Sequence, residues 1–106
     1  MRILLDEDIP RRLGPLLIGL EASTVPGNGE SGIKNGKLLI LAATRFDVFL
    51  TMDQSLGFQQ NLASLSIAVL LARALSKRLE HLRSLLPEIL RALNRIQPKS
   101  LRRVGP

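Results

Sequence analysis

Ile3-Leu4-Leu5-Asp6-Glu7-Asp8 is the stretch that decides how this chain folds. Three apolar residues run directly into three acids, and so short an apolar run bounded by charge predicts a buried strand. Ile9 and Pro10 then open a helical pattern, so the acids fall between the end of a strand and the start of a helix. Ligands of an open α/β sheet bind beyond the carboxyl ends of its strands. The stretch therefore predicts an α/β fold with negative charge at the ligand-binding edge.

The rest of the chain alternates between strand and helix patterns. Apolar residues recur at helical spacing from Ile9 to Leu20, where Pro15 predicts a kink or a late helix start and Gly19 a C-terminal cap. Further strands are expected at 22–25, 48–51, 66–71 and 100–104, and further helices at 35–44, 54–62 and 79–93, the last broken near Pro87. This alternation predicts a mostly parallel sheet of four to five strands, covered on both faces, in one domain spanning residues 1–106.

Composition narrows the class of protein. The chain has 106 residues, of which 45% are hydrophobic, enough for a single core. It has no cysteine, which excludes disulfides, thiolate metal sites and a thiol nucleophile. No apolar stretch approaches the roughly 20 residues that span a bilayer, and the N-terminus lacks a signal-peptide pattern. We therefore expect a cytoplasmic protein without a membrane segment.

The net charge of +6 is unevenly distributed. Residues 1–72 carry six basic and seven acidic side chains, whereas residues 73–106 carry nine basic and two acidic ones. An acidic N-terminal site beside a basic C-terminal third suits a metal-dependent enzyme acting on a polyanion, although an acidic protein partner would fit the basic surface equally well. With three Phe and no Trp or Tyr, a stacking platform for single-stranded bases is not expected.

Acids follow two of the predicted strands. Asp6, with Glu7 or Asp8, follows the first strand, and Asp53 follows the strand at 48–51. Carboxylate oxygens are the ligands that Mg²⁺ and Mn²⁺ prefer, and such an ion can activate water and stabilise a leaving oxygen of a phosphodiester. The structural alternative is that Asp8 and Asp53 only cap the helices that follow them. Paired acids at adjacent strand ends would repel one another without a cation, so the metal site is the preferred interpretation.

A second pattern, Gly27-x-Gly29-x-x-Gly32, matches the dinucleotide-binding fingerprint, with Asp53 about twenty residues further on. The fingerprint requires a helix that starts inside the glycines, so that its backbone N–H groups meet the pyrophosphate. Here Lys34-Asn35-Gly36 delays the helix and Pro26 shortens the strand. A surface loop is therefore the preferred interpretation.

Several motifs together resemble the short PIN-like proteins related to VapC toxins. They are Leu4-Leu5-Asp6-Glu7 before Ile9-Pro10-Arg11-Arg12-Leu13, Ser31-Gly32-Ile33-Lys34-Asn35-Gly36-x-Leu38-Leu39, Leu50-Thr51-x-Asp53 and Gln59-Gln60-Asn61-Leu62. The resemblance runs over nearly the whole chain. It implies a three-layer α/β/α fold, Mg²⁺- or Mn²⁺-dependent cleavage of RNA and a cognate antitoxin partner, and a homodimer is a further expectation.

Carried over by position, the resemblance makes Asp6 and Asp53 the metal ligands, with Glu7 and Asp8 as further candidates. Asn35 and Thr51 are expected to orient water or phosphate.

One position departs from the family pattern. Lys37 stands where the pattern has an acid, so Glu7, Asp8 or Glu30 would have to complete the metal site. A lysine cannot bind a metal ion as a cation, and the alternative function is therefore a catalytically impaired PIN-like binding module. Lys77 is a smaller departure, at a position where the family tends to have a helix-capping Asn.

Receiver domains of response regulators share this layout of acids, with paired acids after the first strand and a phosphoacceptor Asp after the third. The third-strand acid there ends the strand itself, whereas Asp53 lies beyond Leu50, and a lysine-bearing late strand with a further helix is missing. His81 is the one histidine of the chain and a remote candidate for acid–base chemistry.

Overall fold

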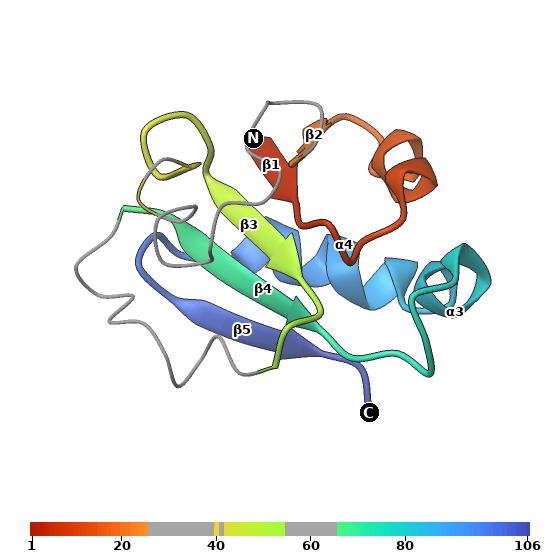
Figure 1. Cartoon of the computed structure of the whole chain (residues 1–106). Helices are drawn as coiled ribbons and strands as arrows, with labels where there is room; N and C mark the ends of the chain where they lie inside the picture. Colours follow the sequence, from red (N-terminus) through yellow and green to blue (C-terminus); the bar gives the residue numbers. More distant parts are fainter. Residues whose placement is uncertain (26–39, 41, 55–65) are drawn as a thin grey trace.

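The computed structural model describes residues 1–25, 40, 42–54 and 66–106, and its strands form one parallel sheet (Figure 1). The strands are β1 (Arg2–Leu5), β2 (Glu21–Thr24), β3 (Val48–Thr51), β4 (Ala68–Ala72) and β5 (Leu101–Val104). They lie in the order β2-β1-β3-β4-β5, and each neighbouring pair is parallel. The predicted parallel α/β sheet is confirmed, with strand bounds that differ from the expected ones by at most two residues.

The two faces of the sheet bury separate sets of side chains. Successive residues of a strand point to opposite faces, so Val48 and Leu50 of β3 enter one cluster while Phe49 enters the other. Every residue of β3 and β4 is buried, as expected for central strands of a parallel sheet covered on both faces. This burial explains why these strands are read from the sequence as continuous apolar runs.

Two helices cover the face of the sheet that carries Val48 and Leu50. They are α3 (Leu79–Arg83) and α4 (Leu86–Arg95), and α4 runs behind the sheet in Figure 1. The predicted break is confirmed: Pro87 lies in the first turn of α4, where its missing N–H has no helical acceptor to lose. Ile89 and Leu93 of α4 are buried against this face.

The segment after β1 differs from the expected α-helix. It forms a short 3-10 helix, η1 (Arg11–Leu16), with a hydrogen bond from Leu17 N–H to the Gly14 carbonyl at 3.0 Å. Pro15 lies inside η1; it has no N–H to donate and crowds the preceding turn, which opposes a regular α-helix. Leu13 and Leu17 are nevertheless buried, so the apolar face was correctly predicted. Gly19 has φ +83°, the left-handed conformation of a helix-ending glycine.

The opposite face of the sheet buries Leu4 and Phe49 together with Ala42 and Phe46, which precede β3. Of the helix predicted at 35–44, Ile40 and Ala42 are helical and residues 43 and 44 form a turn, whereas residues 35–39 and 41 lie outside the described residues. The helix predicted at 54–62 lies outside them from residue 55 on. The described architecture is therefore an α/β fold with a five-stranded parallel sheet.

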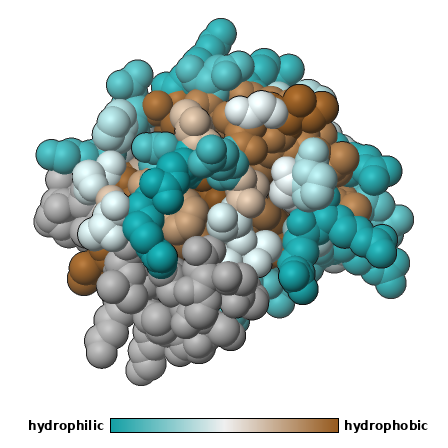
Figure 2. All heavy atoms as spheres, turned by 90° about the horizontal axis from the view of Figure 1, so that it is seen from above, coloured by the Kyte–Doolittle hydropathy of each residue, from teal (hydrophilic) through white to brown (hydrophobic). Residues whose placement is uncertain are grey.

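No helix among the described residues is long and apolar enough to cross a membrane. Seen from above, where β2 forms the upper edge of the sheet in Figure 1, the surface shows hydrophobic atoms lying between polar ones (Figure 2). Ile18, just after η1, is 85% exposed. A scatter of exposed apolar side chains is normal for a folded chain.

Gly105 is required by the close approach of two backbone segments at the end of β5. It has φ +101°, and a Cβ atom there would lie 2.0 Å from the carbonyl oxygen of Arg73. Its N–H also donates to Glu88 Oε2 at 3.1 Å. Position 105 therefore requires glycine for two reasons, the positive φ and the lack of room for a Cβ atom.

We predict that Gly105→Ala lowers the free energy of unfolding by more than Gly19→Ala does. Gly19 also has positive φ but has no atom within 4 Å of the added Cβ, so alanine there costs only the backbone term of about 1 kcal/mol. Urea unfolding of both variants measures the difference. Equal losses would show that the Arg73 carbonyl moves away without cost.

Candidate functional site

The strand order defines where a ligand would bind. The chain goes from β1 to β2 on one side and then to β3 on the other side of β1, which makes the gap between β1 and β3 the topological switch point. Leu5 pairs with Leu50, so Asp6 and Thr51 follow side by side at the carboxyl ends of these strands. The acids predicted from strand ends therefore lie at the switch point.

A chain of hydrogen bonds joins the ends of β1 and β3. The Asp53 N–H donates to Thr51 Oγ1 at 3.0 Å, and the Thr51 hydroxyl donates to Asp6 Oδ2 at 2.7 Å. The other Asp6 oxygen, Oδ1, accepts the Glu7 N–H at 2.8 Å. Thr51 is fully buried and Asp6 is 9% exposed, so the carboxylate is fixed in position.

Asp8 lies close to the same hydroxyl. Its two carboxylate oxygens are 3.2 and 3.1 Å from the Met52 N–H, and Oδ2 is 3.4 Å from Thr51 Oγ1. The Thr51 hydroxyl has one proton, which the shorter distance assigns to Asp6. Asp8 therefore ties the first loop to the residue after β3 and is not a simple cap of η1, whose N-cap makes no side-chain hydrogen bond.

These residues line one pocket of about 560 Å³, hereafter the acidic pocket. Its lining consists of Asp6, Glu7, Asp8, Asp53 and Lys77. Four carboxylates and one ammonium group thus share an opening at the carboxyl edge of the sheet. The pocket is predominantly acidic and would attract a cation.

Burial works against the ionised form of both buried acids. Desolvation raises the pKa of Asp6, with the charges of Glu7 and Asp53 adding to the rise, while hydrogen bonds from Thr51 and the Glu7 N–H oppose it. Desolvation and the charge of Asp6 raise the pKa of Asp8 to about 6, against the Met52 N–H and the charge of Lys77. Ionising these two adjacent carboxylates therefore lowers the free energy of unfolding.

The carboxylates of the acidic pocket suit a divalent ion that keeps several water ligands better than one bound by protein ligands alone. Each oxygen of Asp6 and Asp8 accepts a hydrogen bond, but an ionised carboxylate offers about four lone-pair sites and so can still bind a cation. Mg²⁺ is commonly held by one or two carboxylates plus waters. Within the described ranges, no three His, Asp or Glu side chains form a group that could hold a metal ion by themselves.

Lys77 is the residue of this pocket that the sequence analysis did not assign to the site. It lies in the loop between β4 and α3, and its charge lowers the pKa of Asp8. Its place could have been inferred from the sequence, because Lys77 follows β4, and the loop after β4 opens at the same carboxyl edge as the loops after β1 and β3. Considering only the acids at strand ends leaves Lys77 out.

The structure brings together five of the predicted site residues: Asp6, Glu7, Asp8, Thr51 and Asp53.

The other sequence-based candidates are not part of this arrangement. Asn35, Glu30, Lys37 and the three glycines of the dinucleotide fingerprint lie outside the described residues. His81 is not among the residues that line the acidic pocket; its Nδ1 lies 2.6 Å from the Ser76 hydroxyl at the start of α3.

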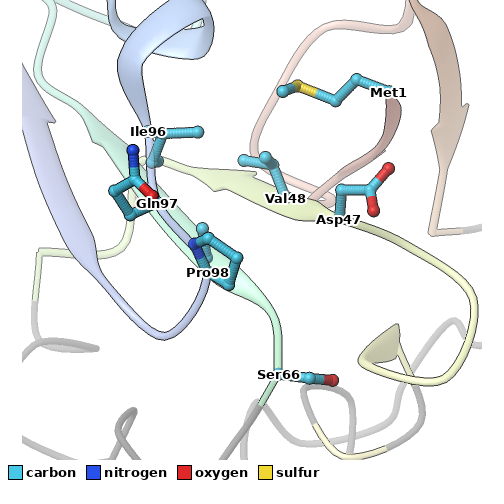
Figure 3. Close-up of a pocket in the computed structure, with 8 residues that line it drawn as sticks. Met1, Asp47, Val48, Ser66, Ile96, Gln97 and Pro98 are labelled. Carbon is cyan, nitrogen blue, oxygen red and sulfur yellow. The ribbon is translucent and has the colours of Figure 1, made fainter.

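A second pocket, of about 200 Å³, opens at the amino ends of the strands (Figure 3). In Figure 3, Met1 and Asp47 lie on one side of it and Ile96, Gln97 and Pro98 on the other. Asp47 Oδ2 accepts the Arg2 N–H at 2.8 Å. Because parallel sheets bind ligands at their carboxyl ends, the acidic pocket is the better candidate site.

No family model, curated protein or solved structure matches this chain. The strand order is common to many doubly wound folds, receiver domains among them, so order alone assigns no activity. In this chain the cation in the acidic pocket comes from the loop after β4, and Thr51, not Asp53, ends β3. The functional argument therefore rests on the chemistry of the pocket.

We predict that Asp8→Asn stabilises the metal-free protein at pH 7.5 by about 1–2 kcal/mol. The pKa of Asp8 is raised from 3.8 to about 6, so its ionised form costs stability above pH 6, and this cost is absent below pH 4. The gain from Asn should therefore disappear as the pH falls from 6 to 4.

Urea unfolding at several pH values in EDTA measures this gain. Asp47→Asn, at the opposite end of the sheet, is the matched control and should not stabilise the chain. A stability difference for Asp8→Asn that does not change with pH would mean that the carboxylate charge is not its cause.

Proposed function

We propose that this chain is a PIN-like, Mg²⁺- or Mn²⁺-dependent ribonuclease that cleaves phosphodiester bonds at the acidic pocket. The observation that carries the proposal is the placing of two partly or fully buried carboxylates, Asp6 and Asp8, on one Thr51 hydroxyl in a pocket lined by two further acids. A fold does not maintain costly adjacent charges without compensation, and a divalent cation supplies it.

Asp6 and Asp8 are the first residues that would hold the ion, with Asp53 and Glu7 within the same pocket. When bound, a divalent ion would polarise the phosphodiester and lower the pKa of a water molecule. Thr51 acts by positioning: its hydroxyl fixes Asp6, and its own oxygen is fixed by the Asp53 N–H. Lys77, which also lines the pocket, would contact a phosphate oxygen of the substrate.

The proposal includes the biological setting that the family resemblance implies. A cognate antitoxin would control the nuclease, the chain would act in the cytoplasm, and a homodimer is its proposed assembly. The supporting observation for RNA is the basic C-terminal third, which complements a polyanion.

We predict that Mn²⁺ raises the melting temperature by mass action, by the equivalent of about 1.4 kcal/mol at ten times Kd. Asp6→Asn and Asp53→Asn should abolish this rise, and each should raise the melting temperature in EDTA because repulsion between carboxylates is relieved. Asp47→Asn, whose carboxylate lies outside the pocket, should retain the full Mn²⁺ effect.

Mn²⁺-dependent cleavage of a labelled RNA, lost in Asp6→Asn, is the matching activity measurement. A wild-type chain whose melting temperature is indifferent to Mn²⁺ would overturn the metal site.

We also predict that Lys77→Met tightens Mn²⁺ binding by about two- to fivefold, since an exposed cation that competes for the same carboxylates is removed. Isothermal titration calorimetry measures the affinity. RNA cleavage should become slower despite the tighter metal, because the phosphate contact is lost. The control is Lys99→Met, on the loop before β5. Unchanged affinity in Lys77→Met would place its ammonium group outside the range of the acids.

The second candidate function is a PIN-like module that binds without cleaving. It is favoured by the ammonium group of Lys77 in the acidic pocket and by Lys37, a lysine where the related pattern has an acid. In this case the ammonium group of Lys77 compensates the carboxylates in place of a metal ion.

Lys37→Glu tests this alternative. If the position belongs to the site, the substitution should tighten Mn²⁺ binding, raise nuclease activity and lower metal-free stability, because a further carboxylate joins the acids. Titration with Mn²⁺ and urea unfolding in EDTA measure these effects. If neither metal affinity nor metal-free stability changes, residue 37 does not contribute to the site.

A further inference from the structure

The basic C-terminal third folds into a groove between α4 and β5, hereafter the arginine groove. Arg91 and Arg95 are four residues apart and so lie on one face of α4. Arg102 of β5 pairs with Leu70, whose side chain packs on the α4 side of the sheet, so Arg102 points to the same side. Together with Arg103 these residues line a groove of about 300 Å³.

The residues that line the groove are mainly charged. Ala92 and Val104 are its apolar lining residues, and Glu88 is its one acid. The Glu88 carboxylate accepts the Gly105 N–H, and within the described part of the chain no ion pair joins it or any other carboxylate to the groove arginines. The guanidinium groups of Arg91, Arg95 and Arg102 therefore face solvent on the α4 side of the sheet, and no carboxylate of the described residues forms an ion pair with them.

The position of the groove connects it with the acidic pocket. β5 is an edge strand, and its carboxyl end lies at the same edge of the sheet as the ends of β1 and β3 because all strands are parallel. Two strand spacings, about 10 Å, separate β5 from β3, which carries Thr51. In Figure 1, β5 forms the edge of the sheet away from β2, and α4 runs behind the sheet.

We propose that the arginine groove binds the phosphate backbone of an RNA strand and leads it to the acidic pocket. The choice of RNA rests on the proposed nuclease function. Guanidinium groups bind phosphate oxygens in pairs, and several of them in a row match a chain of regularly spaced phosphates. A protein partner would need apolar or aromatic anchors at the centre of its interface, and this groove offers only Ala92 and Val104. Binding should therefore be electrostatic and independent of sequence.

The test is fluorescence anisotropy of a labelled single-stranded RNA of about 20 nucleotides, titrated with the full chain in EDTA at about 50–200 mM KCl. EDTA prevents cleavage and removes any contribution of a bound metal. The groove variant is Arg91→Gln with Arg102→Gln. The matched control is Arg11→Gln with Arg12→Gln, which removes the same charge from η1, next to β2 at the far edge of the sheet.

Three phosphate contacts, one for each of Arg91, Arg95 and Arg102, give a slope of log K against log salt of about −2.1, or about 20-fold weaker binding at 200 than at 50 mM KCl. The groove variant should bind about tenfold more weakly at low salt, with a slope near −0.7. The control variant should keep the wild-type slope. Lysine at both groove positions should restore the slope, and urea unfolding should show all variants folded, since the four substituted arginines are exposed.

Two results would overturn the proposal. Equal losses in the groove and control variants would mean that net charge alone attracts RNA. A polyglutamate peptide of matched charge that binds the groove as tightly as RNA would identify an acidic protein as the occupant.

The outcome is independent of the nuclease proposal. The Mn²⁺-dependent rise in melting temperature should persist in the groove variant, and Asp6→Asn should still bind RNA in EDTA. Groove-dependent RNA binding without any effect of Mn²⁺ would support the groove while removing the nuclease.

Discussion

The hydrogen bond from the Thr51 hydroxyl to Asp6 joins the two central strands at the point where both end, and the rest of the site depends on it. A carboxylate that is 9% exposed has lost most of its hydration, and the hydrogen bond from Thr51 lowers the pKa of Asp6, against the rise that burial causes. The bond also fixes the direction of Asp6, while the Met52 N–H holds the Asp8 carboxylate 3.4 Å from the Thr51 hydroxyl oxygen. A buried polar contact thus determines where the charge of the acidic pocket is concentrated.

Charge is segregated by the architecture as well as along the sequence. Acids lie at the carboxyl ends of the central strands, whereas arginines lie on α4 and on the edge strand β5. α4 contributes both to the core and to the charged surface, because Ile89 and Leu93 are buried against the sheet while Arg91 and Arg95 face solvent. The same helix that closes the core therefore supplies half of the arginine groove, and core packing sets the spacing of its guanidinium groups.

The sequence by itself determined the strands and the break between α3 and α4. Central strands of a parallel sheet are apolar on both faces, so 48–51 and 66–71 were recognisable as short apolar runs, and Pro87 marked the break. Asp6 and Asp53 could be predicted to meet because parallel strands end at one edge. The helical pattern of 9–20 correctly identified Leu13 and Leu17 as buried, but periodicity does not distinguish an α-helix from the 3-10 helix formed around Pro15.

Only the tertiary structure decided which side chains share a pocket and what holds them there. Asp6 accepts a hydrogen bond from Thr51 and Asp8 accepts one from Met52, more than 40 positions away in each case, and strand register, not sequence spacing, makes them neighbours. Lys77 entered the pocket for the same reason, because the loop after β4 opens at the shared edge. Arg91 and Arg102 came together because α4 packs on the face of β5 that carries Arg102. Sequence patterns report local burial, whereas sites are built from residues that only the sheet brings together.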